Sequence, residues 1–282
     1  MRLVVLLVAA TGLALASPAA QTKFKSRVET VRFDARVTRD GHPVVGLNAS
    51  DFEVRDNGVL QKVTLIVEGA LPIDVILALD MSASLTQERL LQLKEAAFSL
   101  LESLDDDDRA ALVTFTHVVT RRQALTADHA QVREALPTGE QIGGTALIDA
   151  IYAALAMAEP GEHRTLLIVL SDGLDTASWL DPASVVRSAQ RSEAVIYAIS
   201  TAGRNGTPEI LQEIASASGG EVFEVDSRRL ASTFVQILRE FRQRYLLSYT
   251  PAATPAPGWH RIDVRVKQRG ATVKARSGYQ VR

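Results

Sequence analysis

Residues 73–84 read I-D-V-I-L-A-L-D-M-S-A-S, an apolar run that ends in one carboxylate and two hydroxyls. A short, nearly continuous apolar run is typical of a strand that is buried on both faces of a parallel sheet. Asp80, Ser82 and Ser84 follow as alternate residues, so their side chains can turn towards one point just beyond the sheet. Hard oxygen donors of this kind suit a small divalent cation such as Mg²⁺. The stretch therefore predicts a buried strand with a metal site at its end.

Two later segments repeat this arrangement. Residues 165–173, T-L-L-I-V-L-S-D-G, are an apolar strand that ends in Asp172, and residues 143–151, G-G-T-A-L-I-D-A-I, place Thr145 at the start of an apolar helix. In a parallel α/β sheet, ligands bind in the crevice outside the carboxyl ends of the strands. We therefore expect three loops with five oxygen donors to meet at that edge.

These motifs resemble the metal-ion-dependent adhesion site (MIDAS) of von Willebrand factor A (VWFA) domains in order, spacing and context, over about residues 71–245. The resemblance implies a divalent cation, Mg²⁺ or Mn²⁺, whose sixth position is left for an acidic side chain of a partner protein. It also implies loops that shift on ligation and move the last helix. The residues expected to hold the ion, some of them through water, are Asp80, Ser82, Ser84, Thr145 and Asp172.

The N-terminus has the pattern of a secretory signal peptide. Arg2 precedes an apolar run over residues 3–16, and small residues follow in A-L-A-S-P-A-A, so we expect residues 1–20 to be removed by cleavage after Ala16 or Ala20. A membrane anchor is the alternative, but about 14 apolar residues are short for a span of roughly 20. The expected protein is secreted or periplasmic, soluble, and without a transmembrane segment in its mature chain.

Composition sets further limits. The 282 residues are 46% hydrophobic and 23% charged, which is typical of a globular chain, and they include no cysteine. Disulfides, thiolate metal sites and thiol catalysis are therefore excluded. The formal net charge of −2 gives no indication of nucleic-acid binding.

The chain divides into four parts by its patterns. After the signal peptide, residues 21–69 read as an N-terminal β segment, residues 70–245 as the VWFA domain and residues 246–282 as a C-terminal β segment. Strands alternate with helices in the VWFA domain, which predicts an α/β fold with a doubly wound, mostly parallel sheet. Neither flank has enough strands for a sandwich alone. We therefore expect the two flanks to pair into one small β-sandwich, with the VWFA domain inserted between them.

Local signals support this division. Asn57-Gly58 predicts a tight hairpin turn, and residues 110–115 and 118–124 are expected to form another hairpin. Helices are expected over residues 86–104, 145–158 and 227–244, the last with Leu230, Phe234, Ile237 and Phe241 on its apolar face. The runs D-G-H-P-V-V-G-L-N-A-S-D-F-E-V-R-D-N-G, Y-L-L-S-Y-T-P and R-S-G-Y also resemble a family of exported bacterial VWFA-related proteins, described mainly from Acidobacteria.

Other polar residues have simpler interpretations. The four acids of residues 105–108 lack the spacing of a calcium loop and predict a solvated loop. Asp149 is interpreted either as a capping residue or as a support for the metal site. The five histidines lack ligand-pair spacing, which argues against zinc. The basic residues from about 239 onward are expected on outward strand faces, with a docking surface for an acidic envelope component or anionic lipid as the alternative.

The favoured function is an exported interaction or adhesion module, not an enzyme, that binds an Asp or Glu of a partner protein through its metal ion. One alternative is a structural envelope protein in which the metal only stabilises the fold. Another is a metal-dependent hydrolase, for which Asp149 and His117 are the only candidate bases.

Overall fold

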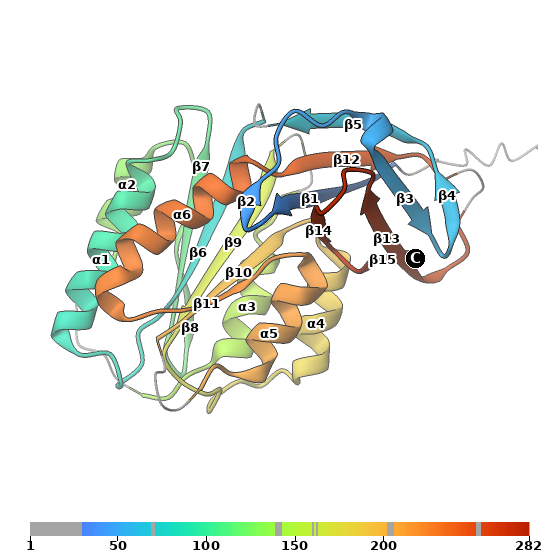
Figure 1. Cartoon of the computed structure of the whole chain (residues 1–282). Helices are drawn as coiled ribbons and strands as arrows, with labels where there is room; N and C mark the ends of the chain where they lie inside the picture. Colours follow the sequence, from blue (N-terminus) through green and yellow to red (C-terminus); the bar gives the residue numbers. More distant parts are fainter. Residues whose placement is uncertain are drawn as a thin grey trace, which may run out of the picture.

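The computed structural model describes residues 30–68, 71–138, 143–159, 161, 163–201, 206–251 and 255–281. The expected signal peptide, residues 1–20, lies outside the described residues. Figure 1 shows an α/β part beside a smaller part made mainly of strands. No helix in the described ranges is long and apolar enough to cross a bilayer.

The α/β part is built on a six-stranded sheet in the order β11-β10-β9-β6-β7-β8. Neighbouring strands are parallel except for β7 and β8, which form the expected antiparallel hairpin. The strands are β6 (Ile73–Asp80), β7 (Arg109–Phe115), β8 (Val119–Thr126), β9 (Arg164–Ser171), β10 (Val195–Ser200) and β11 (Val222–Glu224). The first strand, β6, therefore lies at the centre, between β7 and β9.

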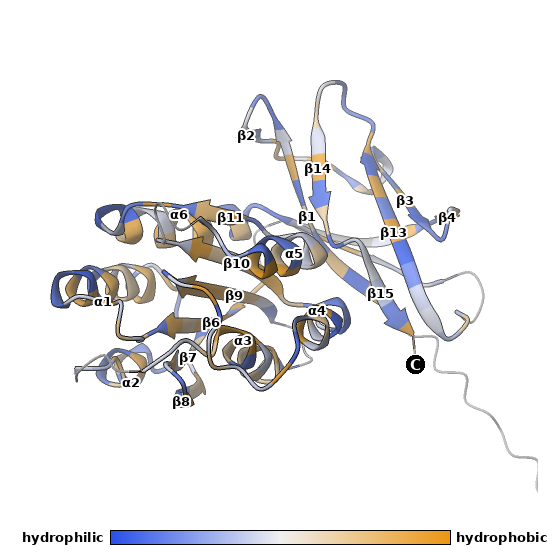
Figure 2. Ribbon diagram, turned by 90° about the horizontal axis from the view of Figure 1, so that it is seen from below, coloured by the Kyte–Doolittle hydropathy of each residue, from blue (hydrophilic) through white to orange (hydrophobic). Residues whose placement is uncertain are grey.

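Helices cover both faces of this sheet (Figure 2). One face carries α1 (Gln87–Leu101), α2 (His129–Glu134) and α6 (Leu230–Arg242), and the other carries α3 (Leu147–Leu155), α4 (Pro182–Arg191) and α5 (Glu209–Ser218). Side chains of β6 alternate between the two cores: Val75 and Leu77 pack under α1 and α6, whereas Ile76 and Ala78 pack under α3. Both faces are buried, which explains why residues 75–79 of the strand are all apolar, and Asp74, near its start, is buried in a pair with Arg109.

The last helix follows the predicted apolar face closely. Leu230, Phe234, Ile237 and Phe241 are all buried against the sheet. The α-helix begins at Leu230, however, and the preceding residues form a 3₁₀ turn, η3 (Ser227–Arg229), capped by Asp226.

The two flanks form two antiparallel sheets, as predicted. Their orders are β14-β1-β12-β5, with β2 on β1, and β15-β13-β3-β4, so each sheet mixes strands from both ends of the chain. Phe33 of β1 and Tyr245 of β12 contribute to the core of this sandwich. Its elements are β1 (Val31–Arg39), β2 (His42–Pro43), η1 (Ala49–Asp51), β3 (Phe52–Asp56), β4 (Val59–Gln61), β5 (Val63–Glu68), β12 (Tyr245–Tyr249), β13 (Gly258–Val266), β14 (Thr272–Ala275) and β15 (Gly278–Val281).

The expectation that the basic tail lies on outward strand faces is wrong for two arginines. Arg244 is fully buried and donates hydrogen bonds to the Tyr197 hydroxyl and the Gly219 carbonyl. Arg276 is 7% exposed and bonds to backbone carbonyls, including that of Gln190 at the end of α4. Arg244 lies between α6 and β12, and Arg276 directly follows β14. Both therefore lie where the sandwich meets the α/β part, and their hydrogen bonds join the two parts.

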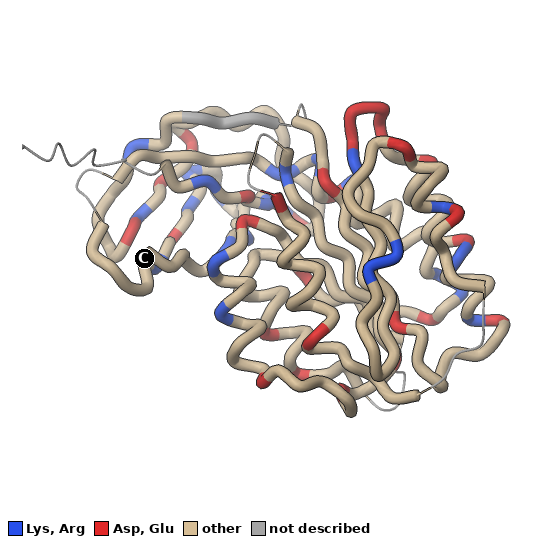
Figure 3. Tube along the Cα trace, turned by 180° about the vertical axis from the view of Figure 1, so that it is seen from behind, with Lys and Arg blue, Asp and Glu red and all other residues tan. Residues whose placement is uncertain are grey.

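The acidic run is also less solvated than expected. Figure 3 shows it as a continuous acidic arc, and Asp106 and Asp107 are exposed. Asp108, in contrast, is only 1% exposed; its carboxylate accepts the Ile73 N–H and pairs with Arg242. One of the four acids therefore fixes the start of the central strand to the end of the last helix.

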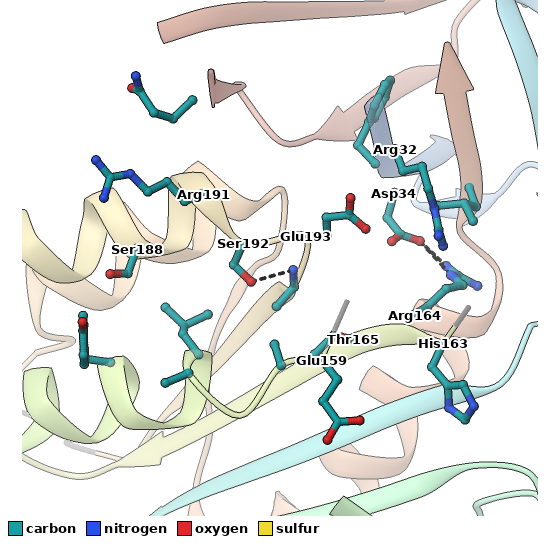
Figure 4. A pocket seen from close by; sticks show the side chains of 18 of the residues that line it. Arg32, Asp34, Glu159, His163, Arg164, Thr165, Ser188, Arg191, Ser192 and Glu193 are labelled. Carbon is teal, nitrogen blue, oxygen red and sulfur yellow. Dashed lines mark hydrogen bonds and ion pairs between the residues drawn. The ribbon is translucent and has the colours of Figure 1, made fainter. Parts of the chain in front are cut away.

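A cleft of about 630 Å³ lies between the two parts, at the end of the sheet where β9 begins. Figure 4 shows Arg164, on β9, pointing at Asp34 of β1 across this cleft. Glu159, another lining residue, pairs with Arg109. Arg164 and Glu159 are thus both neutralised by ion pairs. The cleft lies at the end of the sheet opposite the predicted metal residues, which follow the carboxyl ends of the strands.

Candidate metal centre

Asp80 is the last residue of β6 and is only 2% exposed. One carboxylate oxygen accepts the Ser82 N–H at 2.9 Å, and the other accepts the Ser171 hydroxyl at 2.6 Å. Among the residues that the structure describes, no basic side chain forms an ion pair with Asp80. Burial raises the pKa of Asp80, the nearby charge of Asp172 adds to the rise, and the serine hydrogen bonds oppose it. Within the described residues, Asp80 is therefore a buried carboxylate with hydrogen bonds but without a basic partner.

Ser82, Ser84 and Asp172 form a chain of contacts beside Asp80. The two serine hydroxyl oxygens are 3.0 Å apart, and Ser84 donates to an Asp172 carboxylate oxygen at 2.7 Å. Ser82 and Asp172 are 3% and 8% exposed. The loop after β6 and the residue after β9 are therefore brought together, although 88 positions separate Ser84 from Asp172.

Thr145 reaches the same place from a third loop. A Cβ built on Gly173, the neighbour of Asp172, would lie 3.8 Å from the Thr145 hydroxyl. The Thr145 N–H donates to Thr176, and its carbonyl accepts the N–H groups of Thr176 and Ala177. Helix α3 begins at Leu147 rather than at Thr145. The backbone of Thr145 is therefore held by the loop after β9 instead of by the helix.

The glycine pair before Thr145 is required by close packing. Gly143 has a φ of +83°, and a Cβ there would lie 2.2 Å from a ring nitrogen of His117. A Cβ on Gly144 would lie 2.7 Å from the Thr176 hydroxyl. The loop passes between the loops that follow β7 and β9, and only residues without a side chain fit there.

The five residues lie where the strand order reverses. After β6 the chain continues to β7 and β8 on one side of β6. It then crosses to β9 on the other side of β6. Ligand sites of open α/β sheets lie at such switch points, outside the carboxyl ends of the strands. Asp80 ends β6 and Asp172 follows β9, so the two carboxylates are on either side of this crevice.

Asp149 has a role that the sequence left open. Its two carboxylate oxygens accept the N–H groups of Trp179 and Leu180, each at 2.9 Å. It therefore ties the loop after β9 to α3 and supports the metal residues without joining them. Trp179, on this tied loop, is 95% exposed.

Three further residues at the site were not expected from the sequence: Ser171, Thr176 and Arg89. Ser171 and Thr176 bond to Asp80 and Thr145 as described, and Arg89 of α1 pairs with Asp172 at 3.1 Å. A basic residue in the first turn of a helix opposes the helix dipole. That mismatch at Arg89 was the available signal of an acidic neighbour.

The donor set fits a hard divalent cation. It consists of two carboxylates and three hydroxyls, and the described ranges contain no group of three or more His, Cys, Asp or Glu side chains that would favour another type of metal site. Oxygen ligands of this kind suit Mg²⁺ or Mn²⁺. The structure brings the five residues together, and their role as metal ligands stays a prediction.

Comparisons with known proteins agree with this architecture. The model of the von Willebrand factor type A domain matches residues 74–237. Inter-alpha-trypsin inhibitor heavy chain H4 from Sus scrofa is 29% identical over 137 residues, which cover 45% of this chain and 15% of that protein. The chain therefore spans only a small part of this curated relative.

Solved structures show the same fold at low identity. A von Willebrand factor type A protein from Catenulispora acidiphila has a TM-score of 0.52 and 22% identity, over 76% of this chain and 50% of that one. Proximal thread matrix protein 1 from the mussel byssus, solved with a zinc-occupied MIDAS motif, has a TM-score of 0.53 and 20% identity, over 64% and 48% of the two chains. With the family model matching more than half of its length, the chain belongs to the von Willebrand factor type A domain family.

Proposed function

We propose that this protein is an interaction module that binds an acidic side chain of a partner protein through a divalent cation. Domains of this type generally mediate protein interactions, and one structural neighbour carries zinc in its MIDAS motif. The observation that carries the proposal is the convergence of Asp80, Ser82, Ser84, Thr145 and Asp172, in which Asp80 is buried and has no basic partner among the described residues.

The five residues would contribute two kinds of oxygen ligand to the ion. Asp80 and Asp172 supply negative charge, and the three hydroxyls supply neutral oxygens. Bound there, Mg²⁺ or Mn²⁺ would offer an electrophilic position to a carboxylate of the partner. The hydrogen bonds among the serines and aspartates already hold these oxygens close to one another.

The rim of the site also offers apolar contact area. Trp179 and Leu174, on the loop after β9, are 95% and 61% exposed, and Val118, after β7, is 55% exposed. Exposed tryptophan is unusual in a folded protein, and tryptophan is enriched among residues that dominate binding energy. We therefore expect the partner to present its acidic residue beside apolar ones.

Neither alternative has a specific observation in its favour. A hydrolase needs a general base beside the metal, and both oxygens of Asp149 are already occupied by backbone N–H groups. His117 is exposed and packs over Gly143 on the outer side of the loop. A purely structural metal would not account for the exposed apolar side chains, such as Trp179, beside the site.

The first experiment measures metal binding. At a hundredfold excess over the dissociation constant, Mg²⁺ or Mn²⁺ should stabilise the protein by about 2.7 kcal/mol relative to EDTA. Asp172→Ala should abolish this gain, and Asp181→Ala, at an exposed helix cap, should keep it. An unchanged melting temperature for the wild type would contradict the metal site.

The second experiment measures partner chemistry. An array of peptides that present Glu beside apolar residues should be bound in Mg²⁺ and released by EDTA, and matched Gln peptides should not be bound. Trp179→Ala should weaken this binding about tenfold while leaving the melting temperature unchanged. Metal stabilisation without any Glu-dependent binding would favour the structural alternative.

A further inference from the structure

Arg89 places a cation at the candidate metal site. It lies in the first turn of α1, and its guanidinium is 3.1 Å from one carboxylate oxygen of Asp172. The other Asp172 oxygen accepts the Ser84 hydroxyl. The side chain of Asp172 is 6% exposed and that of Arg89 is 40% exposed, so the arginine closes the outer side of a buried acid. Asp172 is therefore already charge-balanced before any metal binds.

This pairing opposes metal binding. A divalent cation that approaches Asp172 also approaches the guanidinium, and like charges a few ångströms apart repel strongly where water is partly excluded. Arg89 thus stabilises the charge of Asp172, the same acid that the ion would use.

A second set of acids lies within reach of Arg89. A cleft of about 360 Å³ beside the site is lined by Arg89 on one side and by Glu224 and Asp226 on the other. Glu224 ends β11, and Asp226 caps η3 at the start of the last helix. The charge of Arg89 already acts on Asp226, where it contributes to a lowered pKa, mainly set by the hydrogen bond from Arg228. The arginine therefore lies between two groups of carboxylates.

We propose that Arg89 is a positioning residue that competes with the divalent cation for Asp172 and turns into the cleft beside Glu224 and Asp226 when the ion is bound. The inference rests on the metal site of the proposed function and assigns it a built-in competitor. Removing the guanidinium should tighten metal binding, and removing its alternative acceptor should weaken it.

The test measures dissociation constants of Mg²⁺ and Mn²⁺ by calorimetry on the full chain at low salt. Arg89→Gln should bind roughly three- to thirtyfold more tightly than the wild type, a range limited by the partial exposure of Arg89. Arg89→Lys, which keeps the charge, should remain close to the wild type. Arg133→Gln is the matched control, since Arg133 forms an exposed ion pair with Glu102 far from the site and loses the same charge.

Two readouts separate competition from a merely structural role. At about 1 M salt, where charges are screened within about 3 Å, the metal affinity of Arg89→Gln should approach that of the wild type. Asp226→Asn, which keeps a capping side chain, should weaken metal binding about two- to fivefold. In the Arg89→Gln background the same substitution should have no effect, because the group that it accommodates is gone.

The outcomes are distinct for the two proposals. If the wild type binds metal and Asp172→Ala does not, but Arg89→Gln binds no more tightly than the wild type, the role of Arg89 is overturned and the metal site stands. If the wild type itself binds neither Mg²⁺ nor Mn²⁺, both proposals are overturned. Circular dichroism confirms that each variant is folded, and the predicted loss of metal affinity in Asp226→Asn supplies the test if the glutamine variant is not.

Discussion

At the scale of single residues, the site is a set of charges and hydroxyls held in advance of any ligand. Asp80 is buried with hydrogen bonds from Ser82 and Ser171 but with no ion-pair partner in the described part of the chain. Such a group is unfavourable in the metal-free protein, because burial and a neighbouring acid both disfavour its charged form. The same features would make Asp80 a strong ligand for the proposed cation.

The two roles of Asp80 predict opposite effects of one substitution. In EDTA, Asp80→Asn should be at least as stable as the wild type and up to about 1 kcal/mol more stable, because the buried charge is gone. Addition of Mg²⁺ should not raise the free energy of unfolding of Asp80→Asn, whereas it should raise that of the wild type. Urea unfolding with and without metal measures both. Asp181→Asn, at an exposed helix cap, is the control, and a large loss of stability in EDTA would show that the charge of Asp80 is needed by the fold itself.

The sequence predicted the candidate donors but not their neighbours. The alternation of Asp80, Ser82 and Ser84 after an apolar run is a local pattern, and so is the Ser-Asp-Gly around Asp172. The contact between Arg89 and Asp172 joins residues 83 positions apart. Helical phase alone places Arg89 on the first turn of α1 and says nothing of which loop lies opposite.

At the scale of elements, the site depends on how four loops lock together at the end of the sheet. The loop after β6 bonds to Gly143, the loop before α3 bonds to Thr116, and the loop after β9 bonds to Thr145. Asp149 adds the tie between α3 and the residues that precede α4. The position of Thr145 is therefore a consequence of its neighbours' backbones.

Breaking the tie at Asp149 should loosen one loop selectively. Asp149→Ala leaves two backbone N–H groups without their acceptor, and because one of them is exposed to water the loss should be about 1 kcal/mol. Hydrogen exchange of the amides in residues 173–180 should accelerate, and metal affinity should fall with the loss of order around Thr145. Asp128→Ala, which removes the exposed cap of α2, should leave both unchanged. Equal exchange in the two variants would contradict the proposed support.

Some element boundaries follow from local residue preferences, and others depend on packing against other elements. The hairpin at Asn57-Gly58 has the expected positive φ values of 46° and 83°, because these residues accept that conformation in any context. Helix α3 is shorter than its apolar pattern and starts after Thr145. Its first residues are held by contacts with other loops, which periodicity does not encode.

At the scale of the whole molecule, both ends of the chain meet in one sandwich. Asp56 of β3 accepts the hydroxyls of Tyr249 and Tyr279 and pairs with His260, all from the C-terminal flank. The other ring nitrogen of His260 contacts the Ala256 carbonyl at 2.9 Å. Both nitrogens face acceptors, so this site favours the charged imidazolium.

This cluster predicts a pH dependence of stability. Burial alone lowers the pKa of His260, but the hydrogen bonds to Ala256 and Asp56 outweigh it and raise the pKa above its ordinary value. Burial raises the pKa of Tyr249 and Tyr279, which stay neutral. The stabilisation is fully present below the unfolded pKa of about 6.5 and is lost as pH rises through the folded pKa.

Denaturant unfolding across this range measures the effect. The free energy of unfolding of the wild type should fall as pH rises above about 6.5, by at most about 1.4 kcal/mol per pH unit for one group. His260→Gln should remove that slope, and the exposed His42→Gln should retain it. A slope that persists in His260→Gln would assign it to another residue.

The assembled molecule also corrects what charge patterns suggested. Arg244, Arg276 and Asp108 looked like solvated residues, yet all three are buried and bond across the boundary between elements. The cost of burying each of these three charged side chains is offset by a hydrogen-bonded partner. That partner is set by the fold and is absent from the local sequence.

By itself, the sequence determined the order of strands and helices, the parallel α/β sheet and the pairing of the flanks, and it singled out five polar residues that the structure brings together. These features follow from periodicity, turn chemistry and the rule that strand ends share one edge of a sheet, all of which are written in short segments. Only the tertiary structure decided that Arg89 faces Asp172, that Asp149 ties down the loop of Trp179, and which charges are buried. Those contacts join residues distant in the chain, and their energies depend on exclusion of water, which exists only once the layers have packed.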